Sequence, residues 1–351
     1  MNFQKVSEYY NPAIYLWLLT ITAMVLGIII IGGLTRLTDS GLSMTDWRPL
    51  LGTIPPLNKN SWQTVFDMYK QTPEFKIVNK NMSLQEFKYI FWWEWFHRIF
   101  ARLIGIVFIF PLIYFIFKKQ INQTLSIRLA IVFIFGIFQA LVGWWMVKSG
   151  LNDNPYVSPY RLTFHLLNAL IIFSILLWIS MDYRYSIKIE FIPKKFNNDF
   201  YIFVSIILIF ITIASGGFMA GTNSGQSFNT FPLMNGKIFP DDYHLEDYGL
   251  FNIFENTVAI NFNHRWLSIL VFIFILFVCF KYFKFNNENI SKTLSYLIVF
   301  FLTTQVLLGI ATLLSNVYLP LASMHQTNSI LLLSTLLISY HQFKYRKVIN
   351  E

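Results

Sequence analysis

The sequence has 351 residues, of which 55% are hydrophobic and only 13% are charged. A soluble domain carries about a quarter charged residues, so this composition excludes an ordinary soluble protein and predicts a polytopic membrane protein. The net charge of +9 comes from basic residues in short connections between apolar segments, as expected beside anionic lipid, and does not indicate a nucleic-acid partner.

Eight apolar segments are long enough, at about 20 residues each, to cross a bilayer as helices. In chain order they cover residues 13–34, 95–117, 126–147, 160–180, 200–220, 260–283, 292–314 and 320–341. Lysine and arginine gather in the connections after the second, fourth and sixth segments and at the C-terminus. Both termini are therefore expected to be cytoplasmic.

A long outer loop, residues 35–92, separates the first two segments. It is too long for a simple connection, so we expect it to fold over the first four helices as a lid. Within it, a short amphipathic helix is predicted around Trp62, Phe66 and Tyr69.

The two halves of the sequence repeat one another in the same order. Gly32–Ser43 aligns without gaps on Gly216–Ser227, and the other matched sites are His97-Arg98 with His264-Arg265, Gln139 and Gly143 with Gln305 and Gly309, and His165 and Asn168 with His325 and Asn328. The chain is therefore predicted to be an all-α membrane protein of two tandem four-helix bundles, 1–183 and 184–351. An even number of spans in each bundle relates them by a pseudo-twofold axis along the membrane normal.

Four histidines lie within about two turns of the outer ends of the second, fourth, sixth and eighth segments: His97, His165, His264 and His325. A single histidine at a helix end is usually an interfacial polar residue, but four at matched depth in a repeat argue against that. Inward-facing imidazoles on the second and fourth helices of a bundle suit axial ligation of haem iron. The residue four positions after each histidine is small, which leaves room for a flat macrocycle: Ala101, Ala169, Ser268 and Ser329.

Zinc is the competing ligand for these histidines, but no His-Glu-x-x-His spacing is present. The single cysteine, Cys279, lies in an apolar run and is expected to be a small lipid- or core-facing residue. His244 and His341 do not share the depth of the other four and are expected to be surface histidines. Haem is therefore the predicted ligand.

The halves differ at Glu94, which lies three residues before His97, because Asn261 stands at the matched position before His264. A carboxylate can act as a base or stabilise a cation, whereas an amide cannot, so we assign the chemistry to the first half and an electron-handling haem to the second. The alternative is that Glu94 pairs with Arg98 at i+4. Arg98 and Arg265 lie beside the histidines, where they are expected to pair with haem propionates.

These residues resemble the haem A synthases of the bacterial and mitochondrial type, over nearly the whole chain. The most specific parts are Gly32–Ser43, Trp47-Arg48-Pro49 with Gly52-Thr53-Ile54-Pro55-Pro56, and Glu94-Trp95-Phe96-His97-Arg98. The resemblance implies an enzyme that oxidises the C8 methyl group of haem O to a formyl group, making haem A for cytochrome oxidase. It implies a haem B between His264 and His325, the substrate near His97 and His165, and an essential Glu94. Some members have a cysteine pair in an outer loop, so this chain is similar to the cysteine-free branch.

In such an enzyme, two successive hydroxylations give an alcohol and then a geminal diol that loses water to form the aldehyde. We expect Glu94 to stabilise positive charge at the methyl group or to activate the incoming water. The expected partners are haem O, a haem O synthase, an electron acceptor and the bilayer of the bacterial cytoplasmic membrane, with the haem sites towards its outer face and a homo-oligomer left open.

Three other functions are open from the sequence alone. The first is a quinol-oxidising membrane cytochrome with two bis-histidine haems, against which the difference between Glu94 and Asn261 argues. The second is a haem carrier or assembly chaperone. A transporter is the least favoured, because no broken helix or midplane charge is visible in the sequence.

Overall fold

The computed structural model describes residues 10–46, 53–152, 154–185, 199–285 and 289–349. These residues form eight long helices: α1 (Pro12–Leu37), α4 (Leu84–Phe117), α5 (Gln123–Leu151), α6 (Pro159–Arg184), α7 (Asp199–Thr222), α9 (Thr257–Phe285), α10 (Asn289–Leu314) and α11 (Leu319–Ile349). The short elements are α2 (Lys59–Tyr69), α3 (Pro73–Ile77), α8 (Asn252–Glu255), η4 (Ser224–Gln226), η5 (Asp241–Tyr243) and η6 (Glu246–Phe251). The predicted all-α membrane fold is confirmed.

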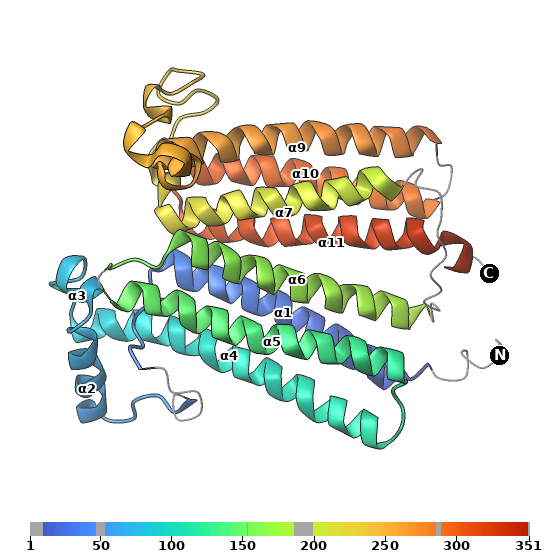
Figure 1. The fold of residues 1–351 in the computed structure, drawn as a ribbon, viewed down its shortest axis with the longest axis horizontal. Helices are drawn as coiled ribbons and strands as arrows, with labels where there is room; N and C mark the ends of the chain where they lie inside the picture. The colour runs from blue at the N-terminus through green and yellow to red at the C-terminus, as the bar shows by residue number, and fades with distance from the viewer. Residues whose placement is uncertain (1–9, 47–52, 153, 186–198, 286–288, 350–351) are drawn as a thin grey trace.

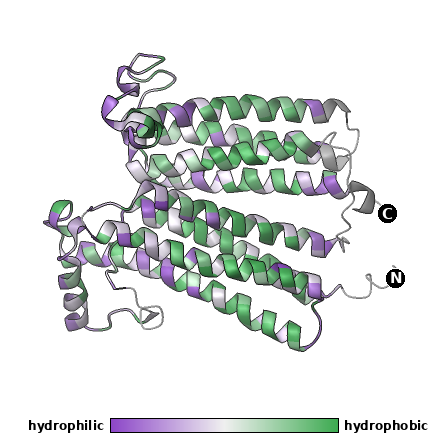
Figure 2. Cartoon of the chain, viewed as in Figure 1, coloured by the Kyte–Doolittle hydropathy of each residue, from purple (hydrophilic) through white to green (hydrophobic). Residues whose placement is uncertain are grey.

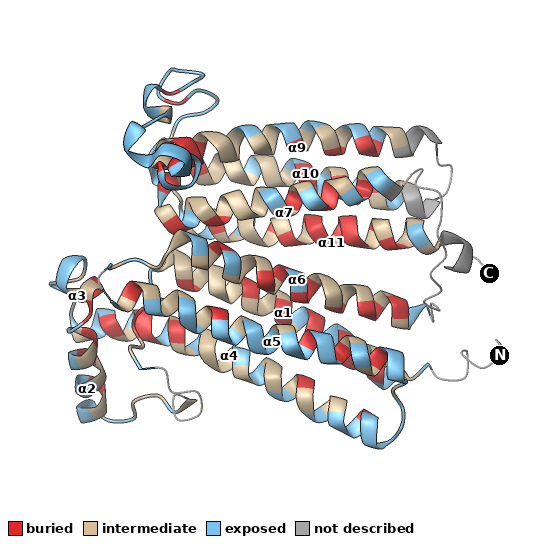
Figure 3. Cartoon of the chain, viewed as in Figure 1, coloured by how far each residue is buried: buried red, intermediate tan, exposed pale blue. Residues whose placement is uncertain are grey.

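Seven of the eight long helices are long and apolar enough to cross a membrane by length and composition, and α11 is the exception. The reason is its position, because α11 packs against α1, α6, α7 and α10. A helix surrounded by protein can carry polar residues that a lipid-facing helix cannot, and Thr335 and Ser339 of α11 are buried. Figure 3 shows buried residues concentrated along α11 and α6, whereas α4, α5 and α9 have more exposed faces.

The helices lie in two groups of four that follow the repeat (Figure 1). We call α1, α4, α5 and α6 the N-terminal bundle and α7, α9, α10 and α11 the C-terminal bundle. The bundles meet where α1 and α6 pack against α7 and α11. The long loops lie at one end of the molecule, which we call the loop end, and α1 begins and α11 finishes at the other. Hydrophobic residues cover the middle of the helices, and polar residues gather towards the loop end (Figure 2).

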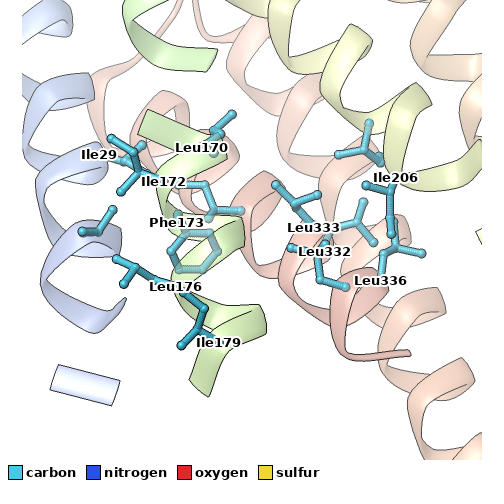
Figure 4. Packing of buried hydrophobic residues seen from close by; sticks show 14 of the residues in the cluster. Ile29, Leu170, Ile172, Phe173, Leu176, Ile179, Ile206, Leu332, Leu333 and Leu336 are labelled. Carbon is cyan, nitrogen blue, oxygen red and sulfur yellow. The ribbon is translucent and has the colours of Figure 1, made fainter. Parts of the chain in front are cut away.

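Apolar side chains from both bundles form one continuous core. Figure 4 shows Leu170, Phe173 and Leu176 of α6 beside Leu332 and Leu336 of α11. Fully burying a leucine or phenylalanine side chain is worth about 1.5–3 kcal/mol against water, but in lipid this gain is largely absent. Close packing therefore has to hold the bundles together.

Two glycines allow that close packing between the bundles. A Cβ added to Gly33 of α1 would collide with the side chain of Gln326 of α11, and one added to Gly217 of α7 would collide with that of Thr163 of α6. Gln326 enters the space at Gly33 and donates from Nε2 to the carbonyl oxygen of Ile29 at 2.9 Å. Gly33 and Gly217 are matched in the sequence repeat, so in both bundles the same glycine of the first helix admits a side chain from the other bundle.

The prediction that His341 is a surface histidine is wrong. Its side chain is fully buried, and its Nε2 lies 2.9 Å from Oδ1 of Asp182, which is 4% exposed. The other oxygen of Asp182 accepts from Nη2 of Arg128 at 2.7 Å, and the ring of Trp178 packs edge-on against His341. Asp182 belongs to the other half of the chain, so the local sequence around His341 carried no sign of this pairing.

The remaining surface and core predictions agree with the structure. His244 is exposed in the loop between α7 and α9. Cys279 is buried in the core cluster, so it is core-facing rather than lipid-facing. The segment Trp47–Gly52, part of the motif that carried the family resemblance, lies outside the described residues.

The helix predicted in the first outer loop is present as α2. Its apolar residues Trp62, Phe66 and Tyr69 are buried against Phe87 and Phe91 at the start of α4. To receive them, α4 begins at Leu84 rather than at the predicted 95. Its start is capped, because the backbone N of Ser83 donates to Oε2 of Glu86 at 2.7 Å and Glu86 N donates to Ser83 Oγ at 3.3 Å.

The following helix α3 carries a buried carboxylate. Glu74 accepts a hydrogen bond from the hydroxyl of Tyr69 at 2.9 Å, and Nδ2 of Asn79 donates to the same hydroxyl at 2.8 Å. Burial raises the pKa of Glu74 to about 7, although the Tyr69 hydrogen bond opposes this shift. The outer loop is therefore a folded unit with its own apolar cluster and a titratable group near neutral pH.

Candidate functional site

The four predicted histidines lie in matched places in the two bundles. His97 of α4 and His165 of α6 are close enough to interact electrostatically, as are His264 of α9 and His325 of α11. All four helices run from the loop end, so the two pairs lie in the half of the molecule nearest to that end (Figure 1). The structure thus brings together the pairs that the repeat predicted.

Each imidazole ring faces a glycine on a neighbouring helix. The Cε1 atom of His97 is 3.0 Å from the position a Cβ on Gly32 would take, and the distances for the other pairs are 2.9 Å (His165 and Gly143), 3.3 Å (His264 and Gly216) and 2.9 Å (His325 and Gly309). A side chain at any of these glycines would displace the ring or strain the packing. The glycines therefore allow the rings their positions.

A glutamine and an asparagine hold the histidine of the last helix in each bundle. In the N-terminal bundle, Gln139 Nε2 lies 3.4 Å from His165 Nε2 and donates to the His165 carbonyl oxygen at 3.0 Å, while Asn168 donates to Gln139 Oε1 at 2.6 Å. In the C-terminal bundle, Gln305 Nε2 lies 3.4 Å from His325 Nε2, and Asn328 donates to Gln305 Oε1 at 2.7 Å. These amides fix the depth of each ring.

The other ring nitrogen, Nδ1, is treated differently in the two bundles. His264 Nδ1 lies 2.7 Å from Oγ of Ser215, and His325 Nδ1 lies 3.1 Å from the carbonyl oxygen of Gln305. In the N-terminal bundle, Nδ1 of His97 and Nδ1 of His165 are buried and have no hydrogen-bond partner among the described residues.

Glu94 lies close to His97 on α4 and is only 3% exposed. Its Oε2 accepts from Ser43 Oγ at 2.7 Å and from the backbone N of Met44 at 2.8 Å, and its Oε1 forms an ion pair with Arg98. The alternative of an i+4 pair with Arg98 is therefore realised, and the carboxylate also holds the segment that follows α1.

Asn261, at the position that matches Glu94, also bonds the segment after the first helix of its bundle, but it carries no charge. It is fully buried, and its Nδ2 donates to the carbonyl oxygen of Ser224 at 2.7 Å, in the segment that follows α7. Its Oδ1 is buried without a hydrogen-bond partner among the described residues. Both positions thus tie the end of the first helix of a bundle to its second helix, and only Glu94 adds a negative charge beside a histidine.

Arg98 and Arg265 both bind the outer loops. Arg98 Nη2 donates to the carbonyl oxygen of Met44 at 3.1 Å, and Arg265 donates to those of Thr230 and Phe228 at 2.8 and 2.7 Å. The Nε of Arg265 is buried without a partner among the described residues. Their predicted pairing with propionates stays a prediction, and the structure adds that they anchor the loops above the histidines.

Both histidine pairs fit a haem. Each offers two imidazoles from facing helices, glycines that admit the rings, and small residues one turn further along at Ala101, Ala169, Ser268 and Ser329. The competing zinc site is disfavoured, because the described residues contain no group of three or more His, Cys, Asp or Glu side chains that could hold a metal ion. When bound, a haem would supply a redox-active iron at each pair.

For some site residues, the sequence showed only that they are matched in the repeat and predicted no role. Gly143, Gln139 and Asn168 and their counterparts were used to align the halves. In the structure the glycine and the glutamine contact the histidine, and the asparagine holds the glutamine. Ser215 carried no sequence signal of its own, because a serine in an apolar helix is common. A comparison of matched positions between the halves would have found it, since Ile31 stands at the equivalent place.

Comparisons with known proteins cover nearly the whole chain. A family model described as cytochrome oxidase assembly protein matches residues 15–337. A protein named Heme A synthase from Nitrosospira multiformis is 41% identical over 337 residues, which is 94% of this chain and 93% of that protein. Another with the same name, from Wolbachia pipientis subsp. Culex pipiens, is 43% identical over 317 residues, or 90% of this chain and 93% of that protein.

Proposed function

The chain belongs to the cytochrome oxidase assembly family that includes the haem A synthases, and we propose that its two bundles divide the work of that enzyme between them. The protein is a membrane oxidoreductase that oxidises the C8 methyl group of haem O to the formyl group of haem A. The expectation drawn from the sequence is confirmed at this level. The division between the bundles is the part that the following observations support.

The N-terminal bundle, residues 1–183, takes haem O between His97 and His165, and the C-terminal bundle, residues 184–351, keeps a haem B between His264 and His325. The observation that carries this assignment is the charge difference between two otherwise matched sites, at Glu94 and Asn261. Helix packing supports it. Among the described residues, α9 and α10 pack more closely than the equivalent α4 and α5, which meet through the stacked rings of Phe108 and Phe133 with centroids 6.2 Å apart. The looser pair suits a bundle that has to admit a substrate.

Glu94 acts on the substrate rather than on the iron. Ser43 and Met44 hold its carboxylate still, and Arg98 balances its charge. A buried carboxylate fixed beside the substrate can stabilise positive charge that develops at the methyl group, or accept the proton of the incoming water. A haem B in the other bundle would supply a second redox centre in the same molecule for the electrons removed.

The proposal includes the location and the partners of the protein. The chain lies in the bacterial cytoplasmic membrane with its termini in the cytoplasm, because the described basic residues Lys118 and Lys119 after α4 and Arg184 at the end of α6 lie at the end where α1 begins and α11 finishes. The histidine pairs then lie towards the outer face. Haem O synthase delivers the substrate, and Arg98 and Arg265, at the loop end, face the propionates.

The test of the proposed function is a pair of variants of the two buried carboxylates at the loop end. The protein is produced with a supply of haem O, and the extracted haems are separated by chromatography. Glu94→Gln should accumulate haem O and still hold haem B, whereas the matched control Glu74→Gln should make haem A as the wild type does. Haem A formation at the normal rate by Glu94→Gln would refute the role of this residue. Haem B alone in the wild type would instead favour the quinol-oxidising cytochrome.

A further inference from the structure

The hydroxyl of Ser215 supports the His264 ring at Nδ1. Ser215 Oγ donates its single hydrogen to the carbonyl oxygen of Thr212 at 2.8 Å. With its hydrogen on Thr212, the hydroxyl can accept a hydrogen bond from His264 Nδ1, 2.7 Å away. A neutral His264 that binds a metal through Nε2 carries its proton on Nδ1, and Ser215 Oγ is placed to accept it.

The second histidine of the C-terminal bundle is fixed in the same way by a different group. His325 Nδ1 lies 3.1 Å from the carbonyl oxygen of Gln305, and a carbonyl oxygen has no proton to give. Its Nδ1 is therefore also the protonated nitrogen. Both rings of this bundle are held at Nδ1, and their Nε2 lone pairs face away from that support, that of His325 towards the Gln305 amide at 3.4 Å.

Among the residues that the structure describes, none gives either ring of the N-terminal bundle such a support. Ile31 stands where the repeat places Ser215, and an isoleucine side chain cannot accept a hydrogen bond from His97. Gln139 bonds the backbone carbonyl of His165 and approaches its Nε2, but not its Nδ1, which lacks a partner among the described residues. The difference therefore applies to both members of each pair.

A hydrogen bond on the second nitrogen of an imidazole changes the ligand in two ways. It holds the ring in its coordinating orientation, and it raises the basicity of the other nitrogen. Removing such a support typically lowers metal affinity by about 10- to 100-fold. A histidine pair with both supports should hold a haem firmly, and a pair with neither should release one readily.

We propose that Ser215 is a positioning residue that makes the C-terminal haem permanent, and that Ile31 at the matched position keeps the N-terminal site exchangeable. This rests on the proposed function, because it assumes that both pairs bind haem. Exchange suits a site whose substrate must enter and whose product must leave. A retained redox group has the opposite requirement. Of the two supports, the Ser215 hydroxyl is the one that a residue difference between the halves explains, because Gln139 and Gln305 are the same residue type.

The test follows haem release from the purified full-length protein to an excess of apomyoglobin. The wild type should release haem in a fast and a slow phase, and His97→Ala and His264→Ala should each remove one of them, which assigns the phases to the bundles. Ser215→Ala should accelerate the slow phase by about 10- to 100-fold. Ser215→Thr, which keeps a hydroxyl, should release haem in the slow phase at about the wild-type rate. Ile31→Ser should slow the fast phase, because the new hydroxyl supports His97.

A redox measurement separates ligand support from a general loss of packing. A less basic His264 stabilises the ferric iron less, so Ser215→Ala should raise the midpoint potential of the retained haem, and Ser215→Thr should not. Unchanged release and unchanged potential in a folded Ser215→Ala protein would overturn the inference and leave the proposed function intact. A wild type that binds no haem when haem O and haem B are supplied would overturn the proposed function itself.

Discussion

Replacing Gly309 with alanine should push the imidazole of His325 away from α10. The new Cβ would lie 2.9 Å from Cε1 of His325 and 3.5 Å from its Nδ1. Ordinary contact begins near 3.4 Å, so the ring must retreat by about 0.5 Å. Gln305 lies one turn before Gly309 on the same helix, so this retreat also stretches the 3.1 Å hydrogen bond from Nδ1 to the Gln305 carbonyl towards a length at which it no longer counts as one.

The expected cost is that of overpacking one methyl group at a fixed ring. Overpacking typically costs about 1–3 kcal/mol, which corresponds to about 5- to 140-fold in haem affinity if it falls on the bound form. The assay is the haem content of purified protein, measured with its thermal unfolding in detergent. Gly309→Ala should show a large loss of haem B content and a smaller decrease in its thermal unfolding temperature.

A matched substitution on another long helix provides the control. Nothing lies within 4 Å of the position that a Cβ on Gly136 of α5 would take. Gly136→Ala should therefore retain haem and gain slightly in stability, because alanine favours the helix by about 0.8–1.0 kcal/mol over glycine. If Gly309→Ala held haem B as firmly as Gly136→Ala does, the close fit of ring and glycine would not matter and the reasoning would be wrong.

Three other predictions concern the loop end and the contact between the bundles. Glu74 has a pKa of about 7 in the folded loop against an ordinary 4.5, so the folded loop holds a proton that the unfolded chain loses between these pH values. Its burial therefore costs little below pH 4.5, destabilises α2 and α3 increasingly as the pH rises to about 7, and changes little above that. Hydrogen-exchange protection there, corrected for the intrinsic exchange rate, should fall between about pH 5 and 7 in the wild type and much less in Glu74→Gln. Asp182→Asn should lower the free energy of unfolding by about 3 kcal/mol, because it breaks the buried ion pair with Arg128. The control Asp39→Asn, at the exposed pair with Arg36, should change it by less than about 1 kcal/mol, and equal effects in thermal unfolding would contradict this. Replacing residues 58–82 with a short linker should reduce conversion of haem O while haem B is retained, and unaltered activity would show that the loop is no lid.

The helices and the pairing of the four histidines were predictable from the sequence because their signals are local or repeated. An apolar run of about 20 residues is a local signal, and seven of the eight predicted segments are apolar enough to be spans. The histidine pairs were predictable because the repeat placed His97 with His165 and His264 with His325 at the same depth. The early start of α4 was also present in the sequence, as Ser83 and Glu86 in a capping-box spacing.

The rest depends on contacts between distant parts of the chain. His341 was misjudged because its partner Asp182 lies in the other bundle. The burial of α11 depends on which helices surround it, and helical periodicity alone does not give its neighbours. The role of Ser215 depends on a ring nitrogen of His264 on another helix, so only the folded chain shows why the residue matters.

The most direct test of the account is the haem content of two double variants purified from cells that make both haem O and haem B. His97→Ala with His165→Ala should keep haem B alone and make no haem A. His264→Ala with His325→Ala should lose haem B and keep only haem from the substrate site. Loss of the same haem from both proteins, or continued haem A formation by the first, would contradict the division of the two bundles into a substrate site and an electron-handling site.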